Sequence, residues 1–270
     1  MNIPFYKMSG AGNDFIFIDN RDGKANKIDR QTLITKACAR NVSVGADGLV
    51  LIEDSKNADF MWRFYNCDGS EAEMCGNASR CAGRFANMNG IAGEKMKFET
   101  LAGVIEAEIK EGVNVKVQLT DPLDERMDYT IELEGETLEV NSINTGVPHV
   151  VCFVDNIEEV DIMKYGSGIR YHSEYAPAGT NVNMCKVLPD GTLRIRTYER
   201  GVEGETMACG TGCVAGAIFA VKKGLTKSPV TCLTTSGLFL KVYLENDKVY
   251  LEGEARVVYK GELTEEAYKY

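Results

Sequence analysis

The stretch NCDGSEAEMCGNASRCAGRFA (residues 66–86) has a counterpart later in the chain, YERGVEGETMACGTGCVAGAIFA (residues 198–220). In both, a polar, acidic approach that contains glycine leads to Cys-Gly. A run of small residues then ends in Phe-Ala, with the phenylalanine ten residues after the cysteine. The two cysteines, Cys75 and Cys209, are 134 residues apart. This pattern predicts that the chain contains an internal repeat.

Two further pairs of segments follow the same spacing. ETLAGVIEAEIKEGVNVKVQL starts at Glu99 and TTSGLFLKVYLENDKVYLEGE starts at Thr234, so that Gly103 aligns with Gly237. Each alternates apolar and polar residues around a polar turn, which predicts a β-hairpin with one buried face. Near the start of each half, SGAGNDFIFID (residues 9–19) aligns with TGVPHVVCFVD (residues 145–155) at an offset of 136. Three matches in one order favour duplication over chance.

The segments after the two cysteines have apolar residues at helical spacing. Asn89-Gly90 ends the first, and Lys222-Lys223-Gly224 ends the second. The second helix is apolar on nearly every side, so we expect it inside its own domain. The sequence therefore predicts a mixed α/β fold of two pseudosymmetric domains, each a curved, mostly antiparallel sheet or barrel around a central helix.

We expect the first domain to cover residues 1–120 and the second 121–261, with the C-terminal tail, about 262–270, packing back on the first. The charge-rich stretch DPLDERMDY, from Asp121, is the expected crossover between the domains.

Composition limits the classes of function. The chain has 270 residues, 44% hydrophobic and 26% charged, as in an ordinary globular protein. Its net charge of −10 argues against nucleic acid or an anionic membrane as a partner. The opening MNIPFYKMSG lacks the features of a signal peptide, and no run approaches eighteen apolar residues, so a cytoplasmic location is expected. The nine cysteines are then expected to be reduced thiols.

Cys75 and Cys209 each stand where a loop becomes a helix. The first backbone N–H groups of a helix are unpaired and carry partial positive charge, which would lower a thiol pKa toward neutrality. The same groups could hold a carboxylate at Gly76-Asn77 and at Gly210-Thr211. Two thiols facing one carbon could remove a proton from one side and return one to the other. The sequence thus indicates inversion of a stereocentre by two bases.

Cysteines can also have structural or metal-binding roles. A free cysteine is most often a small buried hydrophobe, and we assign that role to Cys38, Cys152, Cys185 and Cys232. We expect Cys67, Cys81 and Cys213 to be packing residues in helices or loops. The spacing of Cys75 to Cys81 and of Cys209 to Cys213 lacks the histidine-partnered pairs of a zinc site, so no metal is expected.

Several motifs together make the sequence resemble the diaminopimelate epimerase family, enzymes that work without pyridoxal phosphate. The motifs are KMSGAGNDFIFID, GADGLVLIE, NCDGSEAEMCGNASRC, NTGVPHVV, GTNVNM and YERGVEGETMACGTG, and they span nearly the whole chain. The resemblance implies a cofactor-free epimerase of LL- and meso-diaminopimelate in lysine and cell-wall precursor biosynthesis, with Cys75 and Cys209 as acid and base. It also implies a small amino-acid substrate, a homodimer, and a set of substrate-binding residues: Asn13, Asn66, Gly76, Asn77, Asn181, Glu199, Arg200, Gly210 and Thr211.

Two departures from the family pattern affect the distal part of the substrate site. Val147 stands where many members have asparagine, and the loop ERGVEGET is one residue longer than the commoner form. A racemase of another amino acid, such as histidine, therefore stays an alternative, as does a non-catalytic ligand-binding protein or thiol switch. His149 could be either a site residue or a structural histidine.

Overall fold

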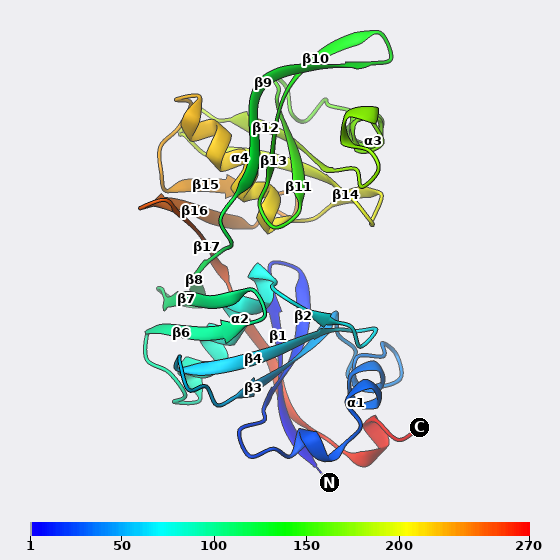
Figure 1. Cartoon of the computed structure of the whole chain (residues 1–270), viewed down its shortest axis with the longest axis vertical. Helices are drawn as coiled ribbons and strands as arrows, with labels where there is room; N and C mark the ends of the chain where they lie inside the picture. The colour runs from blue at the N-terminus through cyan, green and yellow to red at the C-terminus, as the bar shows by residue number, and fades with distance from the viewer. Residues whose placement is uncertain (1) are drawn as a thin grey trace. The chain divides into compact units, whose positions relative to one another are not determined.

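The computed structural model describes residues 2–270 of the chain. It separates into two compact units, Met1–Gln118 with Gly253–Tyr270, and Leu119–Glu252 (Figure 1). The sequence-based boundaries stood at 120/121 and at about 262, so the chain returns to the first unit earlier than the predicted tail. The charge-rich stretch that was expected as a crossover is mostly strand, because β9 begins at Leu123.

The first unit is built mainly of strands. Its elements are β1 (Ile3–Gly10), β2 (Asn13–Asp19), η1 (Ala25–Lys27), α1 (Arg30–Ala37), β3 (Gly48–Glu53), β4 (Phe60–Asn66), β5 (Glu71–Ala72), α2 (Gly76–Met88), β6 (Lys95–Thr100), β7 (Gly103–Ile109), β8 (Asn114–Gln118), β18 (Arg256–Leu263) and η3 (Glu265–Ala267). Most neighbouring strands run antiparallel, while β2–β3 and β4–β6 are parallel.

The second unit repeats this order. Its elements are β9 (Leu123–Leu133), β10 (Glu136–Asn144), β11 (Pro148–Phe153), α3 (Ile162–Arg170), η2 (Ser173–Tyr175), β12 (Asn181–Val187), β13 (Leu193–Glu199), β14 (Gly204–Thr206), α4 (Gly210–Lys222), β15 (Val230–Leu233), β16 (Phe239–Glu245) and β17 (Lys248–Glu254). The parallel pairs recur at the equivalent places, β11–β12 and β13–β15. The mixed α/β class and the duplication are therefore confirmed, as are the hairpins β7–β8 and β16–β17.

The repeat includes a strand that the sequence did not predict. In the second unit β9 precedes β10 and pairs with it antiparallel. In the first unit β1 is the equivalent of β10, and the strand that pairs antiparallel with it in the place of β9 is β18, which comes from the other end of the chain. The first unit is thus completed by residues far away in sequence.

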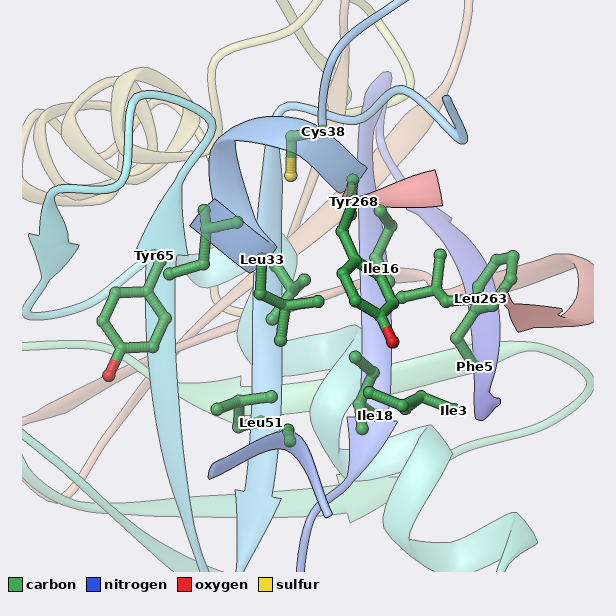
Figure 2. Close-up of a cluster of buried hydrophobic side chains, with 14 of the residues drawn as sticks. Ile3, Phe5, Ile16, Ile18, Leu33, Cys38, Leu51, Tyr65, Leu263 and Tyr268 are labelled. Carbon is green, nitrogen blue, oxygen red and sulfur yellow. The ribbon is translucent and has the colours of Figure 1, made fainter. Parts of the chain in front are cut away.

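Strand β2 shows why the sheet of the first unit carries a layer on each face. Its sequence NDFIFID has four consecutive buried residues, as expected for a strand covered on both sides. Ile16 and Ile18 join Leu33 of α1 and Tyr268 of the C-terminal segment in one hydrophobic cluster (Figure 2). Phe17 faces the other way and stacks on Phe85 of α2, with ring centroids 5.6 Å apart.

The second unit has the same layers. On one face α3 packs on β12 and β13 over a cluster that includes Val150, Val182 and Ile169. On the other face α4 contacts β11, β12, β13 and β16. Most of α4 is buried, from Gly212 to Ala220, which confirms the helix predicted inside its domain. No helix within residues 2–270 is long and apolar enough to cross a membrane.

Candidate active site

Cys75 and Cys209 are the N-cap residues of α2 and α4. Both have extended backbones, with φ of −150° and −124°, and both side chains are partly buried. The carbonyl of Cys75 accepts from the N–H of Ser79 at 2.8 Å, and that of Cys209 from the N–H of Cys213 at 3.0 Å. These are the first bonds of each helix, so the predicted placement of both thiols at helix starts is confirmed.

The predicted lowering of the thiol pKa values is wrong for the free protein. Burial raises the pKa of Cys75, and the N–H groups of Ala78 and Asn77 offset this only in part. Burial and the negative charge of Glu199 raise the pKa of Cys209 to about 12. The helix N-terminus favours the thiolate as expected, but the loss of solvent around the sulfur is the larger effect. Both thiols are therefore protonated at neutral pH.

A chain of polar side chains leads to Cys209. The Sγ of Cys209 lies 3.5 Å from the Oγ1 of Thr211, the second residue of α4. The Nε2 of His149, on β11, lies 2.9 Å from the same hydroxyl. His149 is buried, and burial together with the positive charge of Arg200 lowers its pKa to about 3, so the ring is neutral.

Asn183 of β12 determines which nitrogen of His149 carries the proton. Its Nδ2 donates to the carbonyl of Val150 at 2.9 Å, and its Oδ1 accepts from the hydroxyl of Thr197 at 3.0 Å. Because a carbonyl can only accept, this fixes the amide orientation, and the second Nδ2 hydrogen faces His149 Nδ1 at 3.1 Å. Nδ1 is thus the acceptor and Nε2–H donates to Thr211, which leaves the Thr211 hydroxyl proton available to Cys209.

The first unit has an equivalent pair at the same places in the repeat. The Nδ2 of Asn77, second residue of α2, donates to the Oδ1 of Asn13 on β2 at 2.6 Å. Buried Arg80 donates to Asn77 Oδ1 at 2.6 Å, and Asn13 Nδ2 donates to the Asp47 carboxylate at 3.0 Å. In each unit, therefore, a side chain at the start of a strand holds the second residue of the cysteine-capped helix. The predicted residues Asn13, Asn77 and Cys75 lie together in one unit.

Asn181, Glu199 and Arg200 lie together in the second unit. The Asn181 Oδ1 accepts from the backbone N–H of Arg200 at 2.8 Å, and its Nδ2 donates to the carbonyl of Pro148 at 3.0 Å. The Arg200 guanidinium donates to the carbonyl of Ala178 at 3.3 Å and makes no ion pair with another residue of 2–270. It has the donors free to receive a carboxylate.

The remaining predicted residues fall in two places. Gly76 and Gly210 are the first residues of α2 and α4, directly after the cysteines. Asn66 ends β4 and is exposed, and its Nδ2 donates to the Ser70 hydroxyl at 3.0 Å. No hydrogen bond between described residues joins the Asn66 side chain to Asn13 or Asn77.

The sequence reasoning missed Asn183 and Asp47, and left His149 undecided. A signal for Asn183 exists, since asparagine is depleted in strands and NVNM places it on the same face as Asn181, two residues on. Asp47 lies in the motif GADGLVLIE, but its contact with Asn13 joins the starts of two separate strands, β2 and β3, so the local sequence does not predict it. Within residues 2–270 no cluster of three or more His, Cys, Asp and Glu side chains is arranged to hold a metal.

We expect the free energy of unfolding to fall by about 2 kcal/mol between pH 7 and pH 5 through His149 alone. The folded ring stays neutral down to about pH 3, whereas an unfolded histidine protonates near pH 6.5. The unfolded state therefore binds more protons over this window, and stability decreases as the pH falls. Urea unfolding of wild type and His149→Gln at both pH values checks this: the mutant should lose this part of the difference. His172→Gln, at the other histidine, should retain it, and equal pH dependence in all three proteins would contradict the assignment.

Gly212→Ala should destabilise the second unit by about 1–3 kcal/mol. A Cβ at this position would stand 2.3 Å from Asn183 Oδ1 and 3.2 Å from Thr197 Oγ1, so the buried amide would have to move. Alanine's better helix propensity, worth about 1 kcal/mol, would offset this only in part. Gly204→Ala is the matched control, because its Cβ meets nothing within 4 Å. Thermal unfolding of both variants measures the effect, and equal stabilities would refute it.

Sequence comparison identifies the family. The family profile described as diaminopimelate epimerase matches residues 5–123 and 141–258. The chain is similar to the diaminopimelate epimerase of Aquifex aeolicus, with 48% identity covering 99% of this chain and 100% of that protein. It is also similar to that of Archaeoglobus fulgidus, with 45% identity covering 97% and 96%.

Solved structures share the fold at much lower identity. A phenazine biosynthesis protein of the PhzF family from Enterococcus faecalis has a TM-score of 0.70 at 16% identity, covering 98% of this chain and 100% of that one. A hydroxyproline epimerase from Agrobacterium vitis has a TM-score of 0.65 at 14% identity, covering 97% and 92%. These likenesses extend to the fold only. Because the sequence matches cover nearly the whole chain at high identity, the chain belongs to the diaminopimelate epimerase family. It is therefore an isomerase.

Proposed function

We propose that this chain interconverts LL- and meso-diaminopimelate without a cofactor, using Cys75 and Cys209 as the two acid/base groups. The observation that carries the proposal is the pair of thiols, each capping the central helix of its unit in a member of this family. A thiol at this position has helix N–H groups beside it, and these stabilise negative charge during proton transfer.

The proposed reaction moves one proton at each thiol. The thiolate of one cysteine removes the proton from the α-carbon, and the electron pair of the broken C–H bond passes into the α-carboxylate. The other cysteine then gives its S–H proton to the opposite face of the same carbon. The product has inverted configuration, and the two sulfurs have exchanged protonation states.

Substrate binding supplies a way to form the base. In the free protein the negative charge of Glu199 is one cause of the raised pKa of Cys209. An ammonium group of the substrate next to Glu199 would cancel that charge, and the pKa of Cys209 would fall. The Thr211 hydroxyl, 3.5 Å from the sulfur, then donates to the thiolate. Binding of an amino acid would thus remove the second cause of the raised pKa, after burial, and favour loss of the Cys209 proton to solvent.

The proposed substrate-binding residues fall into sets according to the chemical group of the substrate that each set would bind. The helix starts at Gly76-Asn77 and Gly210-Thr211 offer N–H donors to the α-carboxylate. Arg200 suits the distal carboxylate, and amide oxygens together with Glu199 suit the distal ammonium. The proposed set is Asn13, Asn66, Gly76, Asn77, Asn181, Glu199, Arg200, Gly210 and Thr211.

The two departures from the family pattern leave these groups in place. Val147 removes an amide, at a cost of roughly one hydrogen bond or 0.5–1.5 kcal/mol. In the longer loop, Glu203 accepts from the N–H of Gly201 at 3.0 Å and forms an ion pair with Arg170 at 3.1 Å. The loop is therefore anchored, and Arg200 at its start keeps its backbone bond to Asn181.

The test is incubation of the purified protein with LL-diaminopimelate, with no added cofactor, followed by chromatographic separation of the isomers. We expect the meso isomer to form until equilibrium is reached. Histidine and alanine are tested in parallel. Racemisation of histidine with no conversion of diaminopimelate would replace this proposal by the racemase alternative, and no conversion of any amino acid would favour a binding protein.

We also propose that the enzyme works as a homodimer in the cytoplasm, in lysine and cell-wall precursor biosynthesis. On β18 the side chains of Val258 and Tyr259 are 58% and 44% exposed, and a second copy that covers this strand would bury them. Sedimentation analysis at micromolar concentration decides between dimer and monomer.

A further inference from the structure

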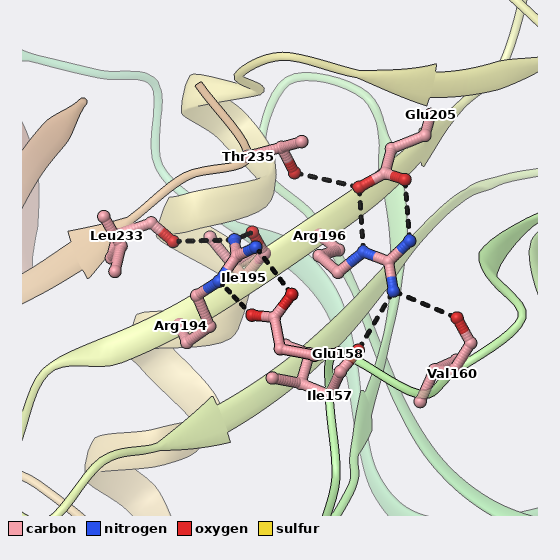
Figure 3. A network of polar contacts seen from close by, with 9 residues as sticks. All are labelled: Ile157, Glu158, Val160, Arg194, Ile195, Arg196, Glu205, Leu233 and Thr235. Atoms are coloured by element: carbon pink, nitrogen blue, oxygen red, sulfur yellow. Dashed lines mark hydrogen bonds and ion pairs between the residues drawn. The ribbon is translucent and has the colours of Figure 1, made fainter. Parts of the chain in front are cut away.

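An arginine–glutamate pair joins β13 to the short strand that leads to Cys209 (Figure 3). The Nε and Nη2 of Arg196 donate to the two carboxylate oxygens of Glu205 at 2.9 and 2.8 Å. The Nη1 of Arg196 donates to the carbonyls of Ile157 and Val160, each at 3.0 Å. The side chains are only 14% and 21% exposed. A bidentate pair of this kind, held in a network, orients its partners more strictly than an exposed single contact.

Glu205 lies four residues before Cys209. It belongs to β14, a three-residue strand that pairs only with β13 in the described ladders: Thr197↔Thr206, Tyr198↔Glu205 and Glu199↔Gly204. The Thr235 hydroxyl also donates to Glu205, at 2.9 Å. Only Met207 and Ala208 separate β14 from Cys209, so a displacement of β14 would also displace this N-cap residue.

The first unit has the same arrangement in a looser form. β5, which leads to Cys75, pairs with β4 through Tyr65↔Glu71, equivalent to Tyr198↔Glu205. Arg63 on β4 reaches Glu71 by one contact of 3.5 Å, and its Nε donates to Glu53 at 3.1 Å instead. Both side chains of this pair are 36% exposed. Duplication has thus placed an arginine–glutamate pair before each cysteine, tight in the second unit and loose in the first.

We propose that Arg196 and Glu205 are positioning residues that hold Cys209 at the start of α4, and that Arg63 and Glu71 do the same, more weakly, for Cys75. The proposal rests on the proposed function for its catalytic consequence. Its geometric part, the coupling of each glutamate to one cysteine, does not depend on which substrate is used.

Glu205→Gln tests the catalytic consequence. The amide NH₂ of glutamine would face the Arg196 donors, so the bidentate contact cannot form. We expect kcat to fall roughly 10- to 100-fold, because a displacement of about 1 Å at a catalytic group has effects of that size. KM should change by less than about twofold, since Glu205 is not among the substrate-binding residues. Glu158→Gln is the matched control: Glu158 is 65% exposed and pairs at 2.8 Å with Arg194, which is on β13 like Arg196. Within residues 2–270 Glu158 makes no hydrogen bond or ion pair with β14.

Alkylation tests the geometry without any substrate. Iodoacetamide labelling of each cysteine, followed by peptide mass spectrometry, should show faster reaction of Cys209 in Glu205→Gln, since a loosened N-cap lets solvent and reagent reach the buried sulfur. Cys75 should react as in wild type. Glu71→Gln should show the reverse pattern with a smaller change, and Glu158→Gln should change neither.

The buried cysteines Cys81, Cys213 and Cys232 report general unfolding in the same experiment. Faster labelling of all of them in Glu205→Gln, or an unchanged rate at Cys209, would overturn the proposal. Should Glu205→Gln fail to fold, Thr235→Val removes one donor to Glu205 and must speed labelling of Cys209 alone; otherwise the proposal also falls. Selective labelling in a protein that does not turn over diaminopimelate would leave the positioning proposal standing while rejecting the proposed function.

Discussion

Cys75→Ala and Cys209→Ala should each lower kcat/KM for LL-diaminopimelate by at least ~10²–10⁴-fold, the usual cost of removing a general acid or base. Each face of the α-carbon needs its own thiol in the proposed reaction, so neither cysteine can replace the other. Both side chains are partly buried N-caps rather than core residues, and alanine should leave the fold intact. Steady-state kinetics in both directions, together with thermal unfolding, measures the two effects separately.

Cys67→Ala is the control for this experiment. Cys67 lies on the same unit as Cys75 and is exposed, so its loss should change neither rate nor stability appreciably. A single mutant of Cys75 or Cys209 that epimerised diaminopimelate at close to the wild-type rate would contradict the two-thiol proposal.

Arg200→Ala should remove most of the preference for diaminopimelate over amino acids with one head group. The guanidinium has no ion pair within the described chain and can form two parallel charge-assisted bonds to a distal carboxylate. A substrate without that group would leave the charge desolvated and unpaired, at a cost of several kcal/mol. We therefore expect wild type to favour diaminopimelate over lysine or alanine at least ~100-fold in kcat/KM, and the mutant to lose most of this ratio.

A substrate panel run on wild type, Arg200→Ala and Arg126→Ala makes this measurement. Arg126 is 54% exposed and already paired with Glu174, so its replacement should leave the selectivity unchanged. Retention of the full preference in Arg200→Ala would remove Arg200 from the proposed distal site.

The duplicated fold could be predicted because its signals are local. The two Cys-Gly segments and the alternating hairpins each specify an element within about twenty residues, and their common spacing specifies the order. The pairing of β1 with β18 could not be predicted, since nothing in either strand encodes a partner at the other end of the chain. The predicted end of the second domain, at residue 261, falls inside β18 because this pairing was not foreseen.

The candidate site, too, could be predicted from the sequence only in part. The N-cap positions of Cys75 and Cys209 follow from the local sequence, and the structure has them as predicted. The thiol pKa values depend on how much of the fold surrounds each sulfur, and local reasoning from the helix N-terminus gave the wrong direction. The chain from Asn183 through His149 and Thr211 joins β12, β11 and α4, so it exists only after folding.

Deuterium incorporation during the first few per cent of reaction tests the two-thiol claim most directly. The purified protein is mixed with LL-diaminopimelate in heavy water without cofactor, and the α-deuterium content of both isomers is followed by mass spectrometry. With one thiol on each face, the meso product should carry one solvent deuterium, while unreacted LL-diaminopimelate should stay unlabelled. If the starting isomer gained deuterium as fast as the product formed, or if the product kept its original proton, a single base would be acting on both faces and the two-thiol mechanism would be contradicted.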